Sequence, residues 1–167
     1  MRALLYSLLL PLSLLTPACS PQAAENAPAP IASGAASQPS VHPVSGLQVI
    51  PLTVTTARGP HAFRVEVART PEEQAKGLMF RTEMGADEGM LFPYDQPHVL
   101  SFWMRNTVLS LDLVFIDEQR RIINVAENAV PYSEQSILSD APGIAVLELN
   151  GGRARALGIV AGNKVEW

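Results

Sequence analysis

The chain has 167 residues, a single cysteine and a formal net charge of −4, with 12 Lys and Arg against 16 Asp and Glu. One cysteine excludes an internal disulfide, and the lack of any basic run argues against a nucleic-acid partner. The length suits one small domain with a terminal extension.

The N-terminal segment has the pattern of an export signal. Residues 1–18, MRALLYSLLLPLSLLTPA, place one positive charge before a run of leucines and small residues. Cys19 follows Ala18 and resembles the lipid-modified cysteine of bacterial lipoproteins, although Pro17 departs from that motif. Ser20 then resembles the residue found in Gram-negative lipoproteins that are sent to the outer membrane. We therefore expect a periplasmic or outer-membrane protein that touches the membrane only through a lipid on Cys19. Removal of Cys19 with the signal is the alternative.

Residues 19–46 predict a disordered tether, because they are rich in Pro, Ala and Ser and have no apolar period. Apart from Arg2 and Glu25, every acidic and basic residue falls in 47–167, which leaves 11 Lys and Arg (12 − 1) against 15 Asp and Glu (16 − 1). This shift in composition predicts a single mildly acidic domain over 47–167.

The first elements of this domain are predicted from local patterns. Residues 47–56 are β-branched, and 62–68 alternate apolar and polar side chains, so the two read as a hairpin with a longer loop. Residues 70–77 predict a helix, with Thr70 and Glu73 placed as a capping box.

The most apolar stretch of the domain is SFWMRNTVLSLDLVFID, residues 101–117. As one strand it would span more than ~50 Å at ~3.3 Å per residue, too long for a domain whose radius of gyration should be about 14 Å. We therefore expect two strands, 99–105 and 111–117, with a break near 106–110. A short strand over 89–94 and a loop with two prolines precede them.

Turn signals recur through the rest of the chain. The pattern predicts strands over 122–129 and 144–152, a loop over 133–143, a short helix over 153–158 and a terminal strand. About seven short strands with one or two short helices predict a mainly β domain, a compact antiparallel sandwich or barrel.

Six segments together resemble one known family. They are VEVARTPEEQAKGLMFR, GMLF, FWMRNT, LDLVFID, VLELNGG and LGIVAGNKV, and they cover roughly residues 48–167. Their order and spacing are similar to the DUF192 (UPF0127) family of uncharacterised bacterial and archaeal proteins, in which Lys is usual where Arg105 stands. The resemblance implies a compact, mostly β domain that is often exported, and it implies no activity.

No catalytic or cofactor motif is found. Nucleophile-elbow, phosphate-loop and dinucleotide patterns are missing, and His42, His61 and His98 are not at the spacing of zinc ligands. We therefore expect no metal and no cofactor.

Two carboxylates stand in apolar strands and must be paired or have a raised pKa. They are Asp112 in SLDLVF and Glu148 in IAVLELN, and Arg81 is a candidate partner, because an arginine fork can hold a carboxylate with two bonds. One interpretation is a buried salt bridge that fixes packing. The other places these groups at the mouth of a pocket with Trp103 as a stacking wall.

Polar residues also mark the strand break. Asn106 and Thr107 can bond backbone groups that the interrupted ladder leaves free.

Four methionines cluster within 26 residues around His98, and thioethers suit Cu(I), although methionine also fills gaps in cores. They are Met79, Met84, Met90 and Met104.

The preferred hypothesis is a non-enzymatic envelope domain that binds a small ligand or another envelope component. Its candidate binding residues are Arg81, Trp103, Asn106, Asp112 and Glu148. One alternative is a small hydrolase that uses Asp112 and Glu148 as acid and base, and another is a periplasmic Cu(I)-binding protein.

Overall fold

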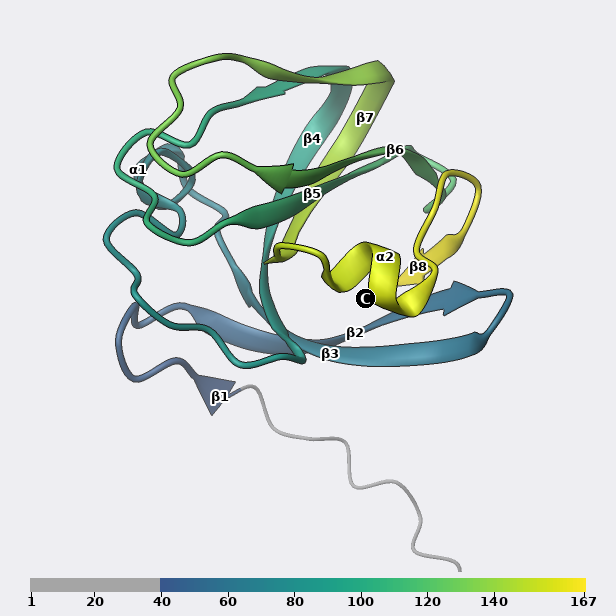
Figure 1. Cartoon of the computed structure of the whole chain (residues 1–167), viewed down its shortest axis with the longest axis horizontal. Coiled ribbons are helices and arrows are strands. Elements are labelled where there is room, and N and C mark those ends of the chain that lie inside the picture. Colours follow the sequence, from purple (N-terminus) through teal and green to yellow (C-terminus); the bar gives the residue numbers. More distant parts are fainter. Residues whose placement is uncertain (1–39) are drawn as a thin grey trace, which may run out of the picture. The chain divides into compact units, whose positions relative to one another are not determined.

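The structure, a computed structural model, describes residues 40–167, so the export signal, Cys19 and most of the tether lie outside the described residues. The described residues form one curled, eight-stranded sheet with two short helices (Figure 1). This confirms the prediction of a mainly β domain. No helix within residues 40–167 is both long and apolar enough to cross a membrane.

The sheet has the order β1-β2-β3-β4-β7-β5-β6, and β8 pairs with β2. All of its pairs are antiparallel except β3 with β4. A bridge between Arg121 and Lys164 also joins the start of β6 to β8, which brings the two ends of the sheet together. The strands are β1 Ser40–Val41, β2 Gln48–Thr56, β3 Gly59–Val67, β4 Glu88–Phe102, β5 Leu111–Ile116, β6 Ile122–Ala129, β7 Ile137–Asn150 and β8 Lys164–Glu166.

Local sequence explains the first elements. β2 and β3 form the predicted hairpin, but the loop is shorter than expected because the pairing continues to Thr56 and Gly59. The helix α1, Pro71–Lys76, has the predicted capping box: the Thr70 Oγ1 accepts from the Glu73 N–H at 3.2 Å, and the Glu73 carboxylate accepts from the Thr70 N–H at 2.9 Å.

Three boundaries differ from the prediction, and pairing with another strand explains each: a neighbouring strand in the first case and a distant one in the other two. The fold begins before residue 47, because β1 pairs with β2. The proline-rich loop after residue 92 lies inside β4, which follows β7 on both sides of a register shift between Pro93 and His98. The expected loop over 133–143 is strand from Ile137 onward for the same reason. A β-bulge accommodates prolines that a regular ladder would not.

Both faces of β5 are covered, so every one of its residues is buried, and the segments of β4 and β7 nearest to it are mostly buried as well. One core lies inside the curl and includes Leu52, Phe63 and Leu147. It is closed by α2, Arg153–Leu157, which lies across the opening of the curled sheet in Figure 1. The second core lies on the other face and includes Met90, Leu113 and Phe115. The alternation of side chains along each strand decides which core a residue joins.

Candidate functional site

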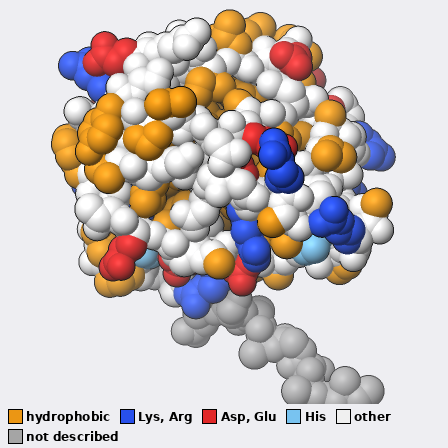
Figure 2. Space-filling view, viewed as in Figure 1, with side chains coloured by type: hydrophobic (Ala, Val, Ile, Leu, Met, Phe, Trp, Pro, Cys, Tyr) orange, Lys and Arg blue, Asp and Glu red, His pale blue; other side chains and the backbone are white. Residues whose placement is uncertain are grey.

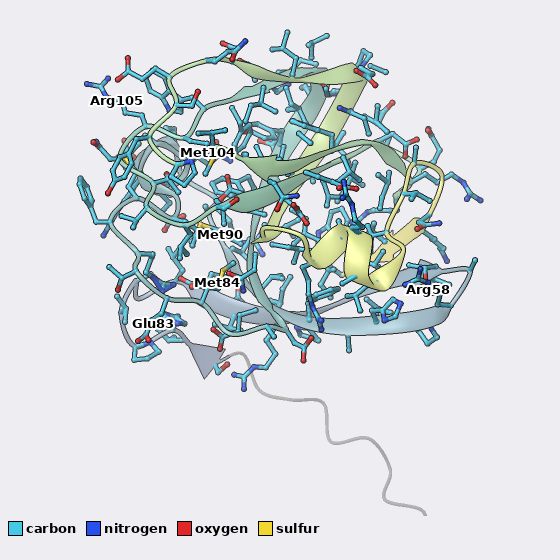
Figure 3. All side chains as sticks on the ribbon, in the orientation of Figure 1. Arg58, Glu83, Met84, Met90, Met104 and Arg105 are labelled. Atoms are coloured by element: carbon cyan, nitrogen blue, oxygen red, sulfur yellow. The ribbon has the colours of Figure 1, made fainter. Side chains whose placement is uncertain are left out.

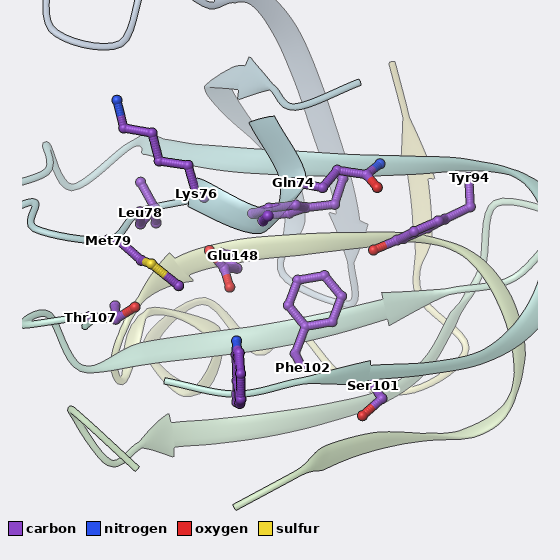
Figure 4. A pocket seen from close by; sticks show the side chains of 13 residues that line it. Gln74, Lys76, Leu78, Met79, Tyr94, Ser101, Phe102, Thr107 and Glu148 are labelled. Carbon is purple, nitrogen blue, oxygen red and sulfur yellow. The ribbon is translucent and has the colours of Figure 1, made fainter. Parts of the chain in front are cut away.

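A cavity of about 170 Å³ opens beside the second core, between the end of α1 and the end of β4 (Figure 4). That volume holds several waters or one small solute. Exposed residues in its lining, such as Lys76 and Ser101, connect it with solvent. It is lined by Gln74, Ala75, Lys76, Gly77, Leu78, Met79, Phe92, Tyr94, Ser101, Phe102, Trp103, Thr107 and Glu148.

Glu148 enters this cavity from the middle of the sheet. It lies on β7, where its cross-strand neighbours are Met90 of β4 and Leu113 of β5, both fully buried. β4 approaches β7 closely here because Gly89 has no side chain: a Cβ at that position would lie 2.5 Å from the Glu148 carbonyl oxygen. Figure 4 shows the Glu148 carboxyl group directed into the cavity, with Met79 and Phe102 beside it.

The Glu148 residue is almost completely buried, with 5% exposed, and none of the hydrogen bonds or ion pairs found among residues 40–167 includes its side chain. Its oxygens are not among the fully enclosed unpaired atoms of the described residues, so they reach the open space of the cavity. Burial raises the pKa of its carboxyl group from 4.5 to about 8. The pKa of the nearby Tyr94 hydroxyl is also raised, first by burial and then by the negative charge of Glu148. A buried carboxyl group in a cleft with so perturbed a pKa marks a candidate functional site.

Aromatic rings form the walls of the cavity. Phe92 and Phe102 meet edge to face, with ring centroids 5.1 Å apart. Gly77 ends α1 with a φ of 46°, and a Cβ there would press on the Phe92 ring at 3.2 Å, so glycine lets the helix end pack on this wall. Trp103 is 46% exposed and stands at the rim, and the Arg105 guanidinium lies 5.3 Å from its ring centroid.

The strand break predicted at Asn106 and Thr107 forms part of this rim. Thr107 donates its hydroxyl to the Arg105 carbonyl at 3.2 Å, as predicted, whereas Asn106 turns the chain through a φ of 54°. The Asn106 carbonyl accepts the Phe80 N–H at 2.9 Å, and the Thr107 carbonyl accepts the Tyr132 N–H at 3.2 Å. Phe80 and Tyr132 also have positive φ, which is uncommon for bulky residues, so three loops hold one another in a strained arrangement.

Asp112 does not belong to this site, which corrects its assignment as a binding residue. It pairs with Leu149 rather than Glu148, so the two carboxylates lie on opposite faces of the sheet. Asp112 is fully buried and accepts three backbone N–H groups, from Asn128 at 2.8 Å, Gly152 at 2.9 Å and Ala154 at 2.8 Å. The two carboxylates therefore cannot act as an acid and base in one cleft, and the hydrolase alternative has no geometric support.

Arg81 pairs with a third acid instead of with Asp112 or Glu148. Its guanidinium bonds the buried carboxylate of Glu66, which also accepts the Ser45 hydroxyl and lies 3.7 Å from the His42 ring. The predicted buried salt bridge is therefore present, but sequence reasoning chose the wrong carboxylate. Glu66 stands in an alternating strand, where it looked like a solvent-facing residue.

Three of the four clustered methionines serve packing, and the fourth, Met79, lines the cavity. Met90 and Met104 are fully buried in the second core, and Met84 packs against it. Figure 3 shows these three inside the domain, while Arg105 points outward. Within residues 40–167 no group of three His, Cys, Asp or Glu side chains is placed to hold a metal ion. No contact of these methionines supports the Cu(I) alternative.

Apolar side chains also reach the surface near α1 and its neighbouring loops, as the orange areas on that side of Figure 2 show. Phe80 is 70% exposed and Tyr132 is 61% exposed on these loops. Charged side chains are scattered over the same face and form no basic patch in this view.

Of the candidate residues, the structure brings Glu148 and Trp103 to one cavity and leaves Arg81 and Asp112 outside it. Asn106 is adjacent, with its amide nitrogen 3.9 Å from the Met79 sulfur. Sequence reasoning missed Tyr94, Phe102 and Gln74. Their positions depend on the irregular pairing of β4 with β7 and on the packing of α1, and neither leaves a local sequence signal.

The fold and site define a small, mostly β domain with a cavity that contains the buried acid Glu148, and comparisons with known proteins agree on the fold. The chain belongs to the DUF192 family, whose model, described as "Uncharacterized ACR", matches residues 52–167.

Two solved structures are similar to the chain. The first is a protein of unknown function from Novosphingobium aromaticivorans DSM 12444, with 56% identity, a TM-score of 0.77, and coverage of 81% of this chain and 98% of that one. The second is a protein from Sinorhizobium meliloti 1021, named as a candidate transcription regulator, with 40% identity, a TM-score of 0.70, and coverage of 72% of this chain and 94% of that one. No curated protein matches the chain.

Proposed function

We propose that this chain is an exported, lipid-anchored domain that binds a small ligand, without catalysis, in the cavity that contains Glu148. One observation carries the binding proposal: the carboxyl group of Glu148, a residue that is 5% exposed, has no partner among the described residues and faces a cavity. Leaving a polar group unpaired costs stability, and natural proteins tolerate that cost chiefly where the group has a task.

The surroundings favour binding over catalysis. The walls are mostly apolar and aromatic, with a few polar groups directed inward, which is the usual composition of a ligand pocket. The other titratable groups in the lining are Tyr94 and Lys76, and Figure 4 shows the Lys76 ammonium directed away from Glu148. No hydroxyl, amine or second carboxyl group of the lining forms a hydrogen bond or ion pair with Glu148, so the described residues show no acid–base or base–nucleophile pair of the kind a hydrolytic step requires.

Blocking the open side of the cavity should weaken binding. We expect Ser101→Phe to weaken binding of any solute that occupies the cavity by at least about tenfold, because it places a ring at the exposed rim where a solute enters. The measurement is a screen of small solutes that follows the indole N–H resonance of Trp103 by NMR. Val99→Phe is the matched control, because it adds a ring to an exposed position of the same strand that does not line the cavity. The binding proposal is wrong if every solute either leaves the Trp103 resonance unshifted or shifts it equally in the wild type and in Ser101→Phe.

Export and anchoring are supported by the order of charge, apolar run, small residue and Cys19 at the N-terminus. We expect mass spectrometry of the mature protein to find a chain that begins at Cys19 with acyl groups attached. An unmodified chain that begins elsewhere would contradict the anchor while leaving the binding proposal intact.

A further inference from the structure

The charge balance of the Glu148 cavity indicates the class of ligand. Among the described residues Glu148 is the only acid in the lining, and Lys76, the one basic residue there, directs its ammonium away from it and forms no ion pair with it. The Arg81 guanidinium is occupied by Glu66, and Arg105 lies over Trp103 with its Nε 3.6 Å from Glu134. When Glu148 is ionised, the cavity therefore has an uncompensated negative charge, which disfavours an anionic ligand and favours a cationic one.

The walls suit an organic cation better than a bare metal ion. Phe92, Tyr94, Phe102 and Trp103 all line the cavity, and aromatic rings attract cations through their quadrupoles. A hard metal ion needs several oxygen ligands, whereas one carboxylate is present and no second His, Cys, Asp or Glu lines the cavity. Apolar walls around one acid instead suit a group with both a positive charge and carbon substituents.

We propose that the cavity binds a small organic ammonium, whose charge pairs with Glu148 while its carbon groups contact the aromatic walls. This inference rests on the proposed binding function and specifies its ligand class. It also predicts that binding releases a proton, because the cation pairs with the ionised form of an acid that is mostly protonated near neutral pH in the empty cavity.

The groups around Glu148 do not add a second titration to the coupling between cation binding and loss of the Glu148 proton. Tyr94 of β4 has a raised pKa and stays neutral over the range of interest, and His98 touches Tyr94, with ring centroids 5.0 Å apart, rather than the cavity. Lys76, at the end of α1, is directed away. The neighbours on β4 and β5 are apolar Met90 and Leu113. Affinity for the cation should therefore rise with pH up to about 8 and level off above it.

The test compares cations with neutral molecules of the same shape. Choline keeps its charge at every pH, and 3,3-dimethylbutan-1-ol is its neutral isostere; butylammonium and butan-1-ol form a second pair with a primary ammonium. We expect calorimetry on the full chain at pH 8.5 to show that at least one cation binds about tenfold or more tightly than its neutral partner. If choline is that cation, its affinity should be about 20-fold lower at pH 6.5 than at pH 8.5.

Glu148→Gln should remove both the preference and the pH dependence, whereas Glu72→Gln, which changes an exposed acid of α1 outside the cavity, should leave both unchanged. Equal binding of cation and isostere in both pairs, or no binding of any of the four, would overturn the ammonium assignment. If the ammonium assignment fails in this way, a solute from the NMR screen whose binding Ser101→Phe weakens would still support the binding function. The failure of the ligand class and the failure of the binding function can therefore be distinguished.

Discussion

Replacing Asp112 with Ala should lower the free energy of unfolding by about 4 kcal/mol, because three buried backbone N–H groups lose their acceptor. The helix α2 depends on this carboxylate. Its N-cap residue is Gly152, which has no side chain to cap the helix, so Asp112 reaches from β5 to accept the Gly152 and Ala154 N–H groups. The loss should appear in urea unfolding at neutral pH.

Asp112→Asn should cost less, roughly 2 kcal/mol. An amide oxygen can keep the Asn128 and Gly152 bonds, which share one carboxylate oxygen, but its NH₂ group would face the Ala154 N–H. Asp117→Ala is the control, because that side chain accepts a single N–H, from Arg121, at an exposed turn and should cost at most about 1 kcal/mol. Unchanged stability in Asp112→Ala would contradict the role of Asp112 in holding the backbone. Loss of cavity binding in folded Asp112→Asn would show that Asp112 has a second role in the ligand site.

The wild-type protein should lose stability as pH rises from about 5 to 9, and Glu148→Gln should remove most of that loss. In the unfolded chain Glu148 releases its proton near pH 4.5, whereas in the folded chain it keeps the proton up to about pH 8. Between these values the unfolded state binds fewer protons, so stability falls as pH rises, by about 1.4 kcal/mol for each unit. The contribution of protonated Glu148 is therefore complete below pH 4.5 and lost as pH passes through 8, roughly 3–5 kcal/mol in all.

Urea unfolding of both proteins at intervals of one pH unit measures this effect, and the difference between the two curves cancels every other titrating group. Parallel curves would mean that Glu148 ionises in the folded state as it does in water. Such a result would place the carboxyl group in solvent or beside a cation, and would contradict its burial.

Local chemistry predicted much of the fold. Three features depend only on a few neighbouring residues and can therefore be predicted directly from the sequence. They are the capping box of Thr70 and Glu73, the alternation in β3 and the break at Asn106. The extent of β4 and β7 could not be read in this way. Each of these strands forms by pairing with the other across 35 or more residues of sequence. The prolines of β4 suggest a loop until the partner strand is known.

The sequence predicted which polar residues of the candidate site are buried, but not which residues they contact. The apolar neighbours of Asp112 and Glu148 correctly predicted that both carboxylates are buried. The strand register then places them on opposite faces of the sheet, because Asp112 pairs with Leu149 and Glu148 pairs with Leu113. Asp112 therefore holds backbone N–H groups, whereas Glu148 faces the cavity. Arg81 could not be assigned from sequence, because its partner Glu66 lies on an alternating strand whose polar face is covered by residues 42–45.

Titration of the Glu148 carboxyl carbon by NMR in the ligand-free protein measures the state of this group directly, with Glu148→Gln assigning the signal. A midpoint near pH 8 is the expected result, because the carboxyl group faces its cavity buried and unpaired. A midpoint near 4.5, the ordinary value, would mean that the acid is solvated or already neutralised, and neither the ligand cavity nor its preference for a cation would then follow.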